Sequence, residues 1–109
     1  KSDGSGATSW GEAGISYSRR TISANATASA NDTLIGITTT NAIELRLAPA
    51  QDLEEGQYFT IKKEVNTNNL VTISASGSQT IDSVSSVTLE SPHAAINLYS
   101  DGAGAYFIY

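Results

Sequence analysis

The chain has no cysteine, no methionine and a single histidine, His93, among its 109 residues. Without cysteine there can be no disulfide, no thiolate metal site and no thiol nucleophile. One imidazole also excludes any metal site that needs several histidine ligands. We therefore expect a protein without disulfide bonds and without a metal or organic cofactor.

Charged residues make up only 16 % of the chain. Basic residues are fewer than acidic ones, with six Lys and Arg against eleven Asp and Glu. The net charge of −5 disfavours nucleic acid as a partner, because proteins bind nucleic acid mainly by neutralising its phosphates. Long apolar runs are absent as well, since none approaches the roughly 18 residues that span a bilayer. We expect no membrane insertion.

Ser and Thr are abundant instead, at fifteen and twelve residues. They take the solubilising role that Lys and Glu have in most proteins. Thr suits β-strands because its branched side chain packs well on a pleated surface, where Lys and Glu are depleted. The composition is typical of all-β proteins found outside the cell or on virion surfaces.

Five segments alternate apolar with polar residues, which is the pattern of strands buried on one face. Short apolar runs at 34–37 and 106–108 predict two further strands. Turn residues separate the segments, which recur every 8–14 residues. This spacing favours an antiparallel sandwich or barrel over alternating strands and helices. We therefore predict an all-β fold, an antiparallel, jelly-roll-like β-sandwich. The expected inward-facing residues are Ile43, Leu45, Leu47, Phe59, Ile61, Val71, Ile73, Ala75, Val87, Leu89, Ile96 and Leu98.

Residues 1–19 differ from the rest, because they contain four glycines and show no sustained period. We interpret them as an extended arm or linker, followed by a β-sandwich domain over residues 20–109. Trp10, Ile15 and Tyr17 are unusual in a linker and are the expected docking residues of the arm on a neighbouring subunit. The alternative is that they are exposed on a tail.

The segment 48–56 predicts one helical turn, with Pro49 near its start and Gly56 just past its end. Further along, Asp101-Gly102 lies between two apolar runs and predicts a hairpin. The last strand of this hairpin is apolar on both faces, whereas a strand that is wet on one side should alternate. Its second face is therefore either covered by the chain itself or meets another subunit. The expected subunit interface consists of Tyr99, Tyr106, Phe107, Ile108 and Tyr109.

Residues that could support catalysis or metal binding are present but poorly arranged. The acidic cluster Asp52, Glu54 and Glu55 and the loop at Asp101 lack the ligand spacing of a dedicated calcium site. Ser91 and His93 come without an oxyanion motif or a nucleophile elbow. A glycosidase needs two paired carboxylates, and the sequence identifies no partner for any of the candidates Glu44, Glu64, Asp82 and Glu90. We expect that the protein is not an enzyme.

Two neighbouring lysines follow the predicted strand at 58–61. If Phe59 and Ile61 face the core, Lys62 points outward and Lys63 points inward. An inward lysine at a strand end usually extends its amine toward solvent. A Lys–Asn isopeptide bond would require a buried lysine beside an asparagine and an acid, and we do not expect one here.

Four elements follow one another in the second half of the chain. They are YFTIKK at 58–63, NLVTI at 69–73, GSQTID at 77–82 and LYSDGAGAYFI at 98–108. In this order they resemble a β-domain of bacteriophage tail fibres, head fibres and capsid decoration proteins, and the resemblance extends over residues 20–109. Ser83 stands where that family often has glycine, and Tyr106 where it has an aromatic residue, often tryptophan.

The resemblance implies a homotrimeric, non-enzymatic structural protein located on the virion, with a capsid or tail protein of the same particle as its partner. One alternative is a capsid-cementing protein whose arm lies across neighbouring capsid subunits. Another is a carbohydrate-binding, receptor-recognition domain whose exposed Tyr and Trp side chains stack on host glycans. Both a capsid and a tail location are compatible with the resemblance.

Overall fold

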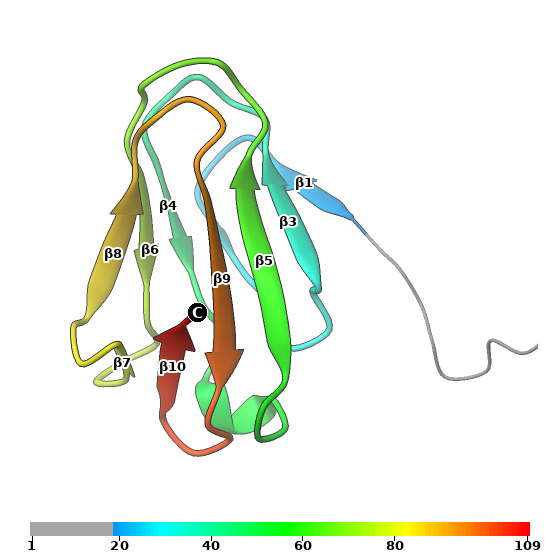
Figure 1. Cartoon of the computed structure of the whole chain (residues 1–109), viewed down its shortest axis with the longest axis vertical. Helices are drawn as coiled ribbons and strands as arrows, with labels where there is room; N and C mark the ends of the chain where they lie inside the picture. Colours follow the sequence, from blue (N-terminus) through cyan, green and yellow to red (C-terminus); the bar gives the residue numbers. More distant parts are fainter. Residues whose placement is uncertain (1–18) are drawn as a thin grey trace, which may run out of the picture.

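The computed structural model describes residues 19–109, which form two β-sheets packed against each other (Figure 1). In Figure 1, β8, β6 and β4 lie on the left, and β9, β5, β3 and β1 lie on the right. The first strand begins at Arg20. The predicted arm residues Trp10, Ile15 and Tyr17 lie outside the described residues.

The two sheets, here called sheet A and sheet B, divide ten strands between them. Sheet A has the spatial order β1-β3-β5-β9-β10-β7, and sheet B has the order β2-β4-β6-β8. The strands of sheet A are β1 (Arg20–Ile22), β3 (Leu34–Ile37), β5 (Tyr58–Lys63), β9 (Ala95–Ser100), β10 (Ala105–Ile108) and β7 (Thr80–Ile81). Those of sheet B are β2 (Ala26–Thr27), β4 (Ile43–Arg46), β6 (Val71–Ser74) and β8 (Ser86–Leu89).

Both sheets are mixed, which corrects the prediction of an antiparallel sandwich. β1, β3 and β5 pair in parallel in sheet A, as do β2, β4 and β6 in sheet B. The reason is that the chain changes sheet at every strand from β1 to β6, so two crossings return it to the same sheet in its original direction. Between strands of the described part of the chain, antiparallel pairing occurs at β5–β9, β9–β10 and β6–β8, while β10 pairs with β7 in parallel. A single antiparallel bridge also joins Ile81 to Val84. The jelly-roll expectation is not confirmed.

The core confirms the predicted alternation. Ile35, Ile61 and Ile96 stand side by side across sheet A, and all three are buried. Leu45 and Ile73 face them from neighbouring strands of sheet B. Each such side chain contributes roughly 1.5–3 kcal/mol when it is fully buried. The two-residue period of each strand therefore holds one apolar face of each sheet against the other.

The predicted helical turn is confirmed as the 3-10 helix η1 (Ala50–Asp52), which begins after Pro49. The chain then turns through Gly56, whose φ of 84° lies in the left-handed region that favours glycine. Two buried side chains tie η1 to the C-terminal hairpin. Ser100 donates a hydrogen bond to the Ala50 carbonyl at 2.8 Å, and Tyr106 donates one to the Ala48 carbonyl at 2.8 Å.

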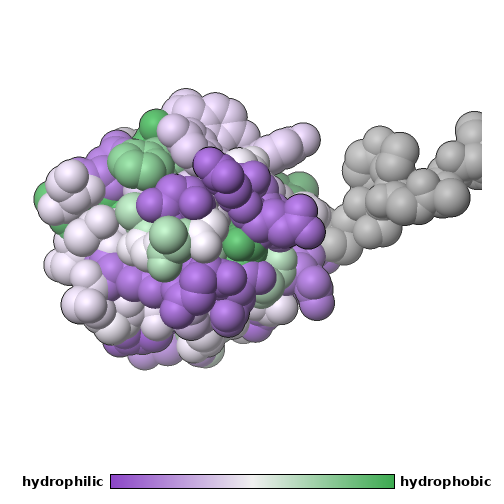
Figure 2. All heavy atoms as spheres, turned by 90° about the horizontal axis from the view of Figure 1, so that it is seen from below, coloured by the Kyte–Doolittle hydropathy of each residue, from purple (hydrophilic) through white to green (hydrophobic). Residues whose placement is uncertain are grey.

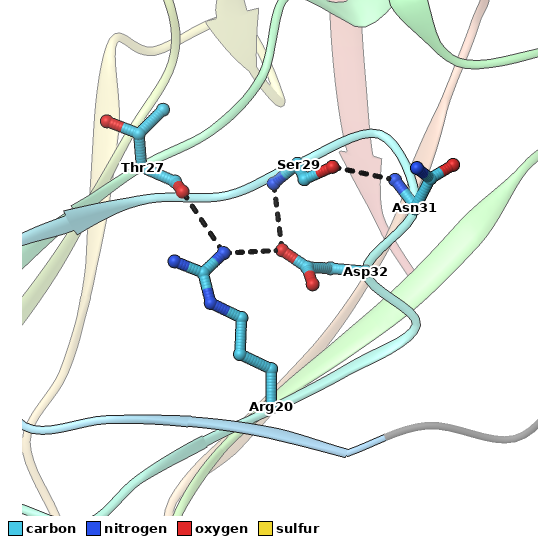
Figure 3. Close-up of polar contacts among 5 residues, drawn as sticks. All are labelled: Arg20, Thr27, Ser29, Asn31 and Asp32. Carbon is cyan, nitrogen blue, oxygen red and sulfur yellow. Dashed lines mark hydrogen bonds and ion pairs between the residues drawn. The ribbon is translucent and has the colours of Figure 1, made fainter.

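An ion pair fixes the turn between β2 and β3 (Figure 3). Arg20 binds a carboxylate oxygen of Asp32 at 2.8 Å and the Thr27 carbonyl at 3.2 Å. The same Asp32 oxygen accepts a hydrogen bond from the Ser29 backbone N–H at 2.8 Å, while the Ser29 hydroxyl accepts one from the Asn31 N–H at 3.2 Å. The edge strand β1 is thereby fastened to the loop that crosses from sheet B back to sheet A.

A two-residue turn joins Ile81 to Val84. Backbone hydrogen bonds run both ways between these residues, at 2.7 and 2.9 Å. The two central residues, Asp82 and Ser83, have φ values of 49° and 72°. This is the geometry of a type I′ turn, whose second central position favours glycine. Ser83 thus occupies a strained conformation at the position where the resembling family often has glycine.

Replacing Ser83 with glycine is expected to stabilise the protein by about 0.5–1 kcal/mol, because glycine adopts positive φ without steric cost. The matched control is Ser85→Gly, since Ser85 is also exposed but has no positive φ. That change should be neutral or slightly destabilising. Urea denaturation of the two variants measures the difference, and an equal response at both positions would contradict the strain argument.

Candidate functional site

Aromatic side chains form a row across the outer surface of sheet A. Tyr58 of β5 stands directly opposite Tyr99 of β9, which in turn stands opposite Phe107 of β10. Tyr109 follows at the end of β10 and completes what we call the aromatic face (Tyr58, Tyr99, Phe107 and Tyr109). Tyr58 is 67 % exposed, Tyr99 37 % and Tyr109 60 %. The row places large apolar groups where an outward-facing strand position normally carries polar ones.

The rings of the aromatic face contact one another, so they form one surface. The Tyr99 ring centroid lies 5.6 Å from that of Phe107 and 5.8 Å from that of Tyr109. Tyr58 meets Tyr109 edge to face at 6.5 Å, with an angle of 85° between the ring planes. Such pairs stabilise one another by about 0.5–1.5 kcal/mol beyond the area they bury. The rings therefore support each other as a platform.

A shallow hollow of about 540 Å³ lies beside these rings, lined by Gly56, Tyr58, Tyr99 and Tyr109. The space beside Gly56 is open, because no atom comes within 4 Å of the place where a side chain would start. The lining is mostly apolar and comes largely from the three tyrosine side chains. It can accept a flat apolar group, such as an aromatic side chain of another subunit or the apolar face of a sugar ring.

The aromatic face ends where sheet A becomes polar. Thr60 donates a hydrogen bond to the Asn97 side chain at 2.9 Å, and Lys62 binds the His93 carbonyl at 2.6 Å. Beyond them Arg19 and Glu64 form an ion pair, and the hydrogen bond from Arg19 lowers the pKa of Glu64. The apolar surface of sheet A is therefore confined to the end of the strands where η1 lies.

The outer surface of sheet B has the opposite character. It carries a charged pair, with Arg46 at 3.7 Å from Glu44, and Glu44 also accepts a hydrogen bond from Ser74 at 2.7 Å. A small hollow of about 230 Å³ opens beside this pair. The remaining outward residues of β6 and β8 are hydroxylic: Thr72, Ser86 and Thr88. The outer surface of sheet B is thus hydrophilic and suited to exposure to solvent.

The five predicted interface residues fall into three groups. Tyr99, Phe107 and Tyr109 lie together on the aromatic face. Ile108 points to the other side of β10 and is 39 % exposed. Tyr106 is only 1 % exposed and packs edge to face on Phe59 in the core, so its prediction as an interface residue is wrong. A strand that is apolar on both faces does not reveal from sequence which face is covered.

Sequence reasoning missed Tyr58 as a member of this site. The alternation of β5 correctly places Tyr58 on the outward side, opposite to Phe59. What the sequence lacks is the pairing of β5 with β9, which brings Tyr58 beside Tyr99 although they are far apart in the chain. An outward tyrosine among Thr and Lys was the available signal.

The predicted acidic loops lie at the end of the molecule that carries η1. Asp52, Glu54 and Glu55 are exposed. Seen from below, this end carries mostly hydrophilic side chains, with small and separate hydrophobic patches (Figure 2). Within residues 19–109, nowhere do three or more acidic or histidine side chains converge as the ligands of a metal ion would. The acidic residues of this end belong to solvated loops.

Asp101 has a structural task in the β9–β10 turn. One of its carboxylate oxygens accepts hydrogen bonds from the backbone N–H groups of Gly104, Ala103 and Ala105, at 2.9, 2.8 and 3.1 Å. These bonds lower the pKa of Asp101 below its ordinary value of 3.8. The carboxylate thus closes the hairpin whose Asp-Gly signal the sequence displays, and Gly102 supplies the left-handed residue with a φ of 77°.

Asp101→Asn should destabilise the protein at neutral pH, because the amide oxygen is a weaker acceptor than the carboxylate. A lowered pKa in the folded state stabilises the fold above the ordinary pKa of 3.8, and this contribution is lost as the pH falls through the lowered pKa. The difference in unfolding free energy between the wild type and Asp101→Asn should therefore become smaller as the pH falls. Denaturation curves across this pH range test the point, and a constant gap would contradict it.

The candidate catalytic carboxylates do not contact one another in the hydrogen bonds and ion pairs of residues 19–109, and Glu44, Glu64 and Asp82 each have a different partner. Glu44 belongs to the outer face of sheet B, and Glu64 is paired with Arg19. Asp82 accepts a hydrogen bond from the Ile108 backbone N–H at 3.1 Å. His93 is an exposed loop residue with a φ of 58°, and its backbone N–H binds the Val65 carbonyl at 3.1 Å. These contacts hold turns and edges in place.

The chain was also compared with known proteins. No protein-family model matches it, and no curated protein matches it at a significant level. Among the described residues there is no helix that is long and apolar enough to cross a bilayer.

Proposed function

We propose that this chain is a non-enzymatic structural domain of a virion, a phage fibre or capsid decoration domain, that assembles as a homotrimer through its aromatic face. The observation that carries the proposal is the row Tyr58–Tyr99–Phe107, extended by Tyr109, on one side of the sandwich. Its three tyrosines are exposed, and Phe107 is half-buried. Contiguous exposed aromatic surface of this kind marks interaction sites, because soluble monomers rarely leave it in water.

The difference between the two outer faces supports self-association with a defined orientation. Sheet A presents tyrosines and a phenylalanine, while sheet B presents hydroxyls and the Glu44–Arg46 pair. In a trimer the aromatic faces meet around the common axis, and the hydroxylic faces of sheet B remain in water. Each aromatic residue can bury on the order of 150–250 Å². The same interface covers the apolar end of β10.

The virion part of the proposal rests on the resemblance over residues 20–109. The φ of 72° at Ser83 supports it, because the resembling domains often have glycine there. A net charge of −5 keeps such a domain from adhering to packaged DNA. Three copies on one axis present identical loops to a capsid, tail or host partner and convert weak contacts into avidity.

The test is the mass of the wild-type protein in solution, measured by light scattering at several concentrations. We expect about three times the chain mass of 11.4 kDa. A mass of one chain at every concentration would overturn the proposal, because the aromatic face would then stand uncovered in a stable monomer.

A second candidate function, carbohydrate binding, is favoured by one specific observation, the open hollow lined by Gly56, Tyr58, Tyr99 and Tyr109. Exposed tyrosine rings can stack on the apolar face of a sugar, while their hydroxyls form hydrogen bonds with its hydroxyl groups. This function requires the hollow to remain open, so it predicts a monomer that binds oligosaccharides. Titration with maltohexaose, chitohexaose and xylohexaose, repeated with Tyr58→Ala, distinguishes it from trimer formation.

A further inference from the structure

Lys63 is completely buried at the end of β5, although it carries an amine. The sequence correctly predicts that its side chain points inward, but the amine does not reach solvent. Its Nζ atom donates hydrogen bonds to three backbone carbonyl oxygens. They belong to Thr67 at 3.0 Å, Asn69 at 2.7 Å and Glu90 at 2.7 Å.

The number of partners matches the chemistry of the group. An ammonium has three N–H donors and no acceptor, and here three carbonyls accept from it. Two of the distances are as short as charge-assisted hydrogen bonds usually are. None of the ion pairs among residues 19–109 involves Lys63. Within the part of the chain that the structure describes, the positive charge is therefore held by carbonyl dipoles, in the way that backbone oxygens hold a bound cation.

The three carbonyls come from two loops, and Asn69 extends the connection to a third. The three loops, here called the upper loops (38–42, 64–70 and 90–94), all cross from one sheet to the other at the top of Figure 1. The Asn69 amide donates hydrogen bonds to the Thr39 carbonyl at 3.1 Å and the Asn41 carbonyl at 2.8 Å. Thr67 in turn donates to the Asn69 side-chain oxygen at 2.6 Å.

We propose that the carbonyls of Thr67, Asn69 and Glu90 form a binding site for a primary ammonium ion, and that Lys63 is its resident, tethered occupant. The tethered cation does here what a bound metal ion does in other loop clusters. It holds the upper loops in one arrangement and lets them cross the sandwich without a helix or a disulfide to brace them. This inference does not depend on the proposed trimer.

The contacts of Lys63 and Asn69 argue against a covalent link between these two residues. An isopeptide bond needs an asparagine side chain within reach of the amine and an acid beside both groups. The Asn69 side chain is hydrogen-bonded to Thr39, Asn41 and Thr67, and the hydrogen bond that Asn69 accepts from the amine is made by its backbone carbonyl. The Glu90 contact is likewise made by the backbone oxygen. The three carbonyls therefore bind the Lys63 ammonium through hydrogen bonds.

Chemical rescue tests the proposal. Lys63→Ala removes the atoms from Cγ to Nζ, which are the atoms of n-propylammonium, and should lower Tm by about 10 °C or more, because three carbonyls lose their cation. Adding n-propylammonium should raise Tm of the variant in a saturable manner. Neither 1-propanol, which has the shape without the charge, nor tetramethylammonium, which has the charge without N–H donors, should do so.

Lys62→Ala is the matched control, because Lys62 is the adjacent lysine but lies on the outer side with one backbone partner, the His93 carbonyl. Its Tm should not respond to n-propylammonium. An equal rise of Tm in the wild type and both variants would overturn the proposal, and so would a Lys63→Ala protein as stable as the wild type.

If Lys63→Ala does not fold, NMR of the wild type and of Lys62→Ala decides. We expect one lysine ammonium signal that exchanges slowly with water, with through-space contacts to residues 67, 69 and 90, in both proteins. Absence of a protected signal from either protein would overturn the proposal.

Discussion

Phe107→Asp is expected to convert the proposed trimer into monomers. In a trimer built on the aromatic face, the substitution brings three carboxylates together beside Tyr99, with which Phe107 stacks at 5.6 Å. Placing like charges in a closed interface costs several kcal/mol, which weakens association by roughly a hundredfold or more. Light scattering should then give the mass of a single chain, 11.4 kDa.

The control for this experiment is Thr88→Asp, which adds the same charge to the outer face of sheet B. Thr88 is exposed among other hydroxyls, so the variant should remain trimeric. Circular dichroism must show that both variants retain the sheet signal. If Phe107→Asp stays trimeric, or if Thr88→Asp dissociates equally, the aromatic face is not the interface and the orientation of the subunits is wrong.

Tyr106→Ala is expected to cost about 3–5 kcal/mol of unfolding free energy, because it leaves a cavity beside Phe59 and removes a buried hydrogen bond. Tyr106→Phe keeps the ring and loses only the bond to the Ala48 carbonyl, at a cost of about 1–2 kcal/mol. Comparing the free-energy losses of the two variants separates the contribution of ring packing from that of the hydrogen bond. Urea denaturation gives both values, and similar losses in the two variants would contradict the packing argument.

Alkaline pH provides an independent measurement on the same residue. Burial, together with the negative charge of Asp52, raises the pKa of Tyr106 to about 12 from an ordinary value of 10.0. The unfolded chain loses the phenol proton first, so the stabilising contribution is complete below pH 10.0 and disappears as the pH rises through about 12. Tyr106→Phe should therefore lose less stability than the wild type over this range.

Local alternation is the part of this structure that the sequence could reveal. Leu45, Ile61 and Ile73 are buried as predicted, because a two-residue period has only two possible faces and one of them is apolar. Lys63 follows the same rule and points inward even though it is charged. The Asp101-Gly102 hairpin was equally readable, since its geometry depends on adjacent residues.

What the sequence could not reveal depends on contacts between distant segments. The pairing of Tyr58 with Tyr99 is set by the register of β5 against β9, which no local pattern encodes. The parallel direction of β3 and β5 follows from the path of the chain between the sheets. Tyr106 was ambiguous for a different reason, because a strand with two apolar faces gives no sign of which one is covered.

The alternation of the chain between the sheets has a consequence for folding. The pairings of β1 with β3 and of β3 with β5 are non-local, because in each case a strand of the opposite sheet lies between the two partners in the sequence. The hairpin of β9 and β10 is the exception, since its strands are separated by a short turn. Sheets closed by non-local pairing fold slowly, in milliseconds to seconds. Since each connection from β1 to β6 runs from one sheet to the other, neither sheet can form from a continuous stretch of this part of the chain, and the two layers must assemble together.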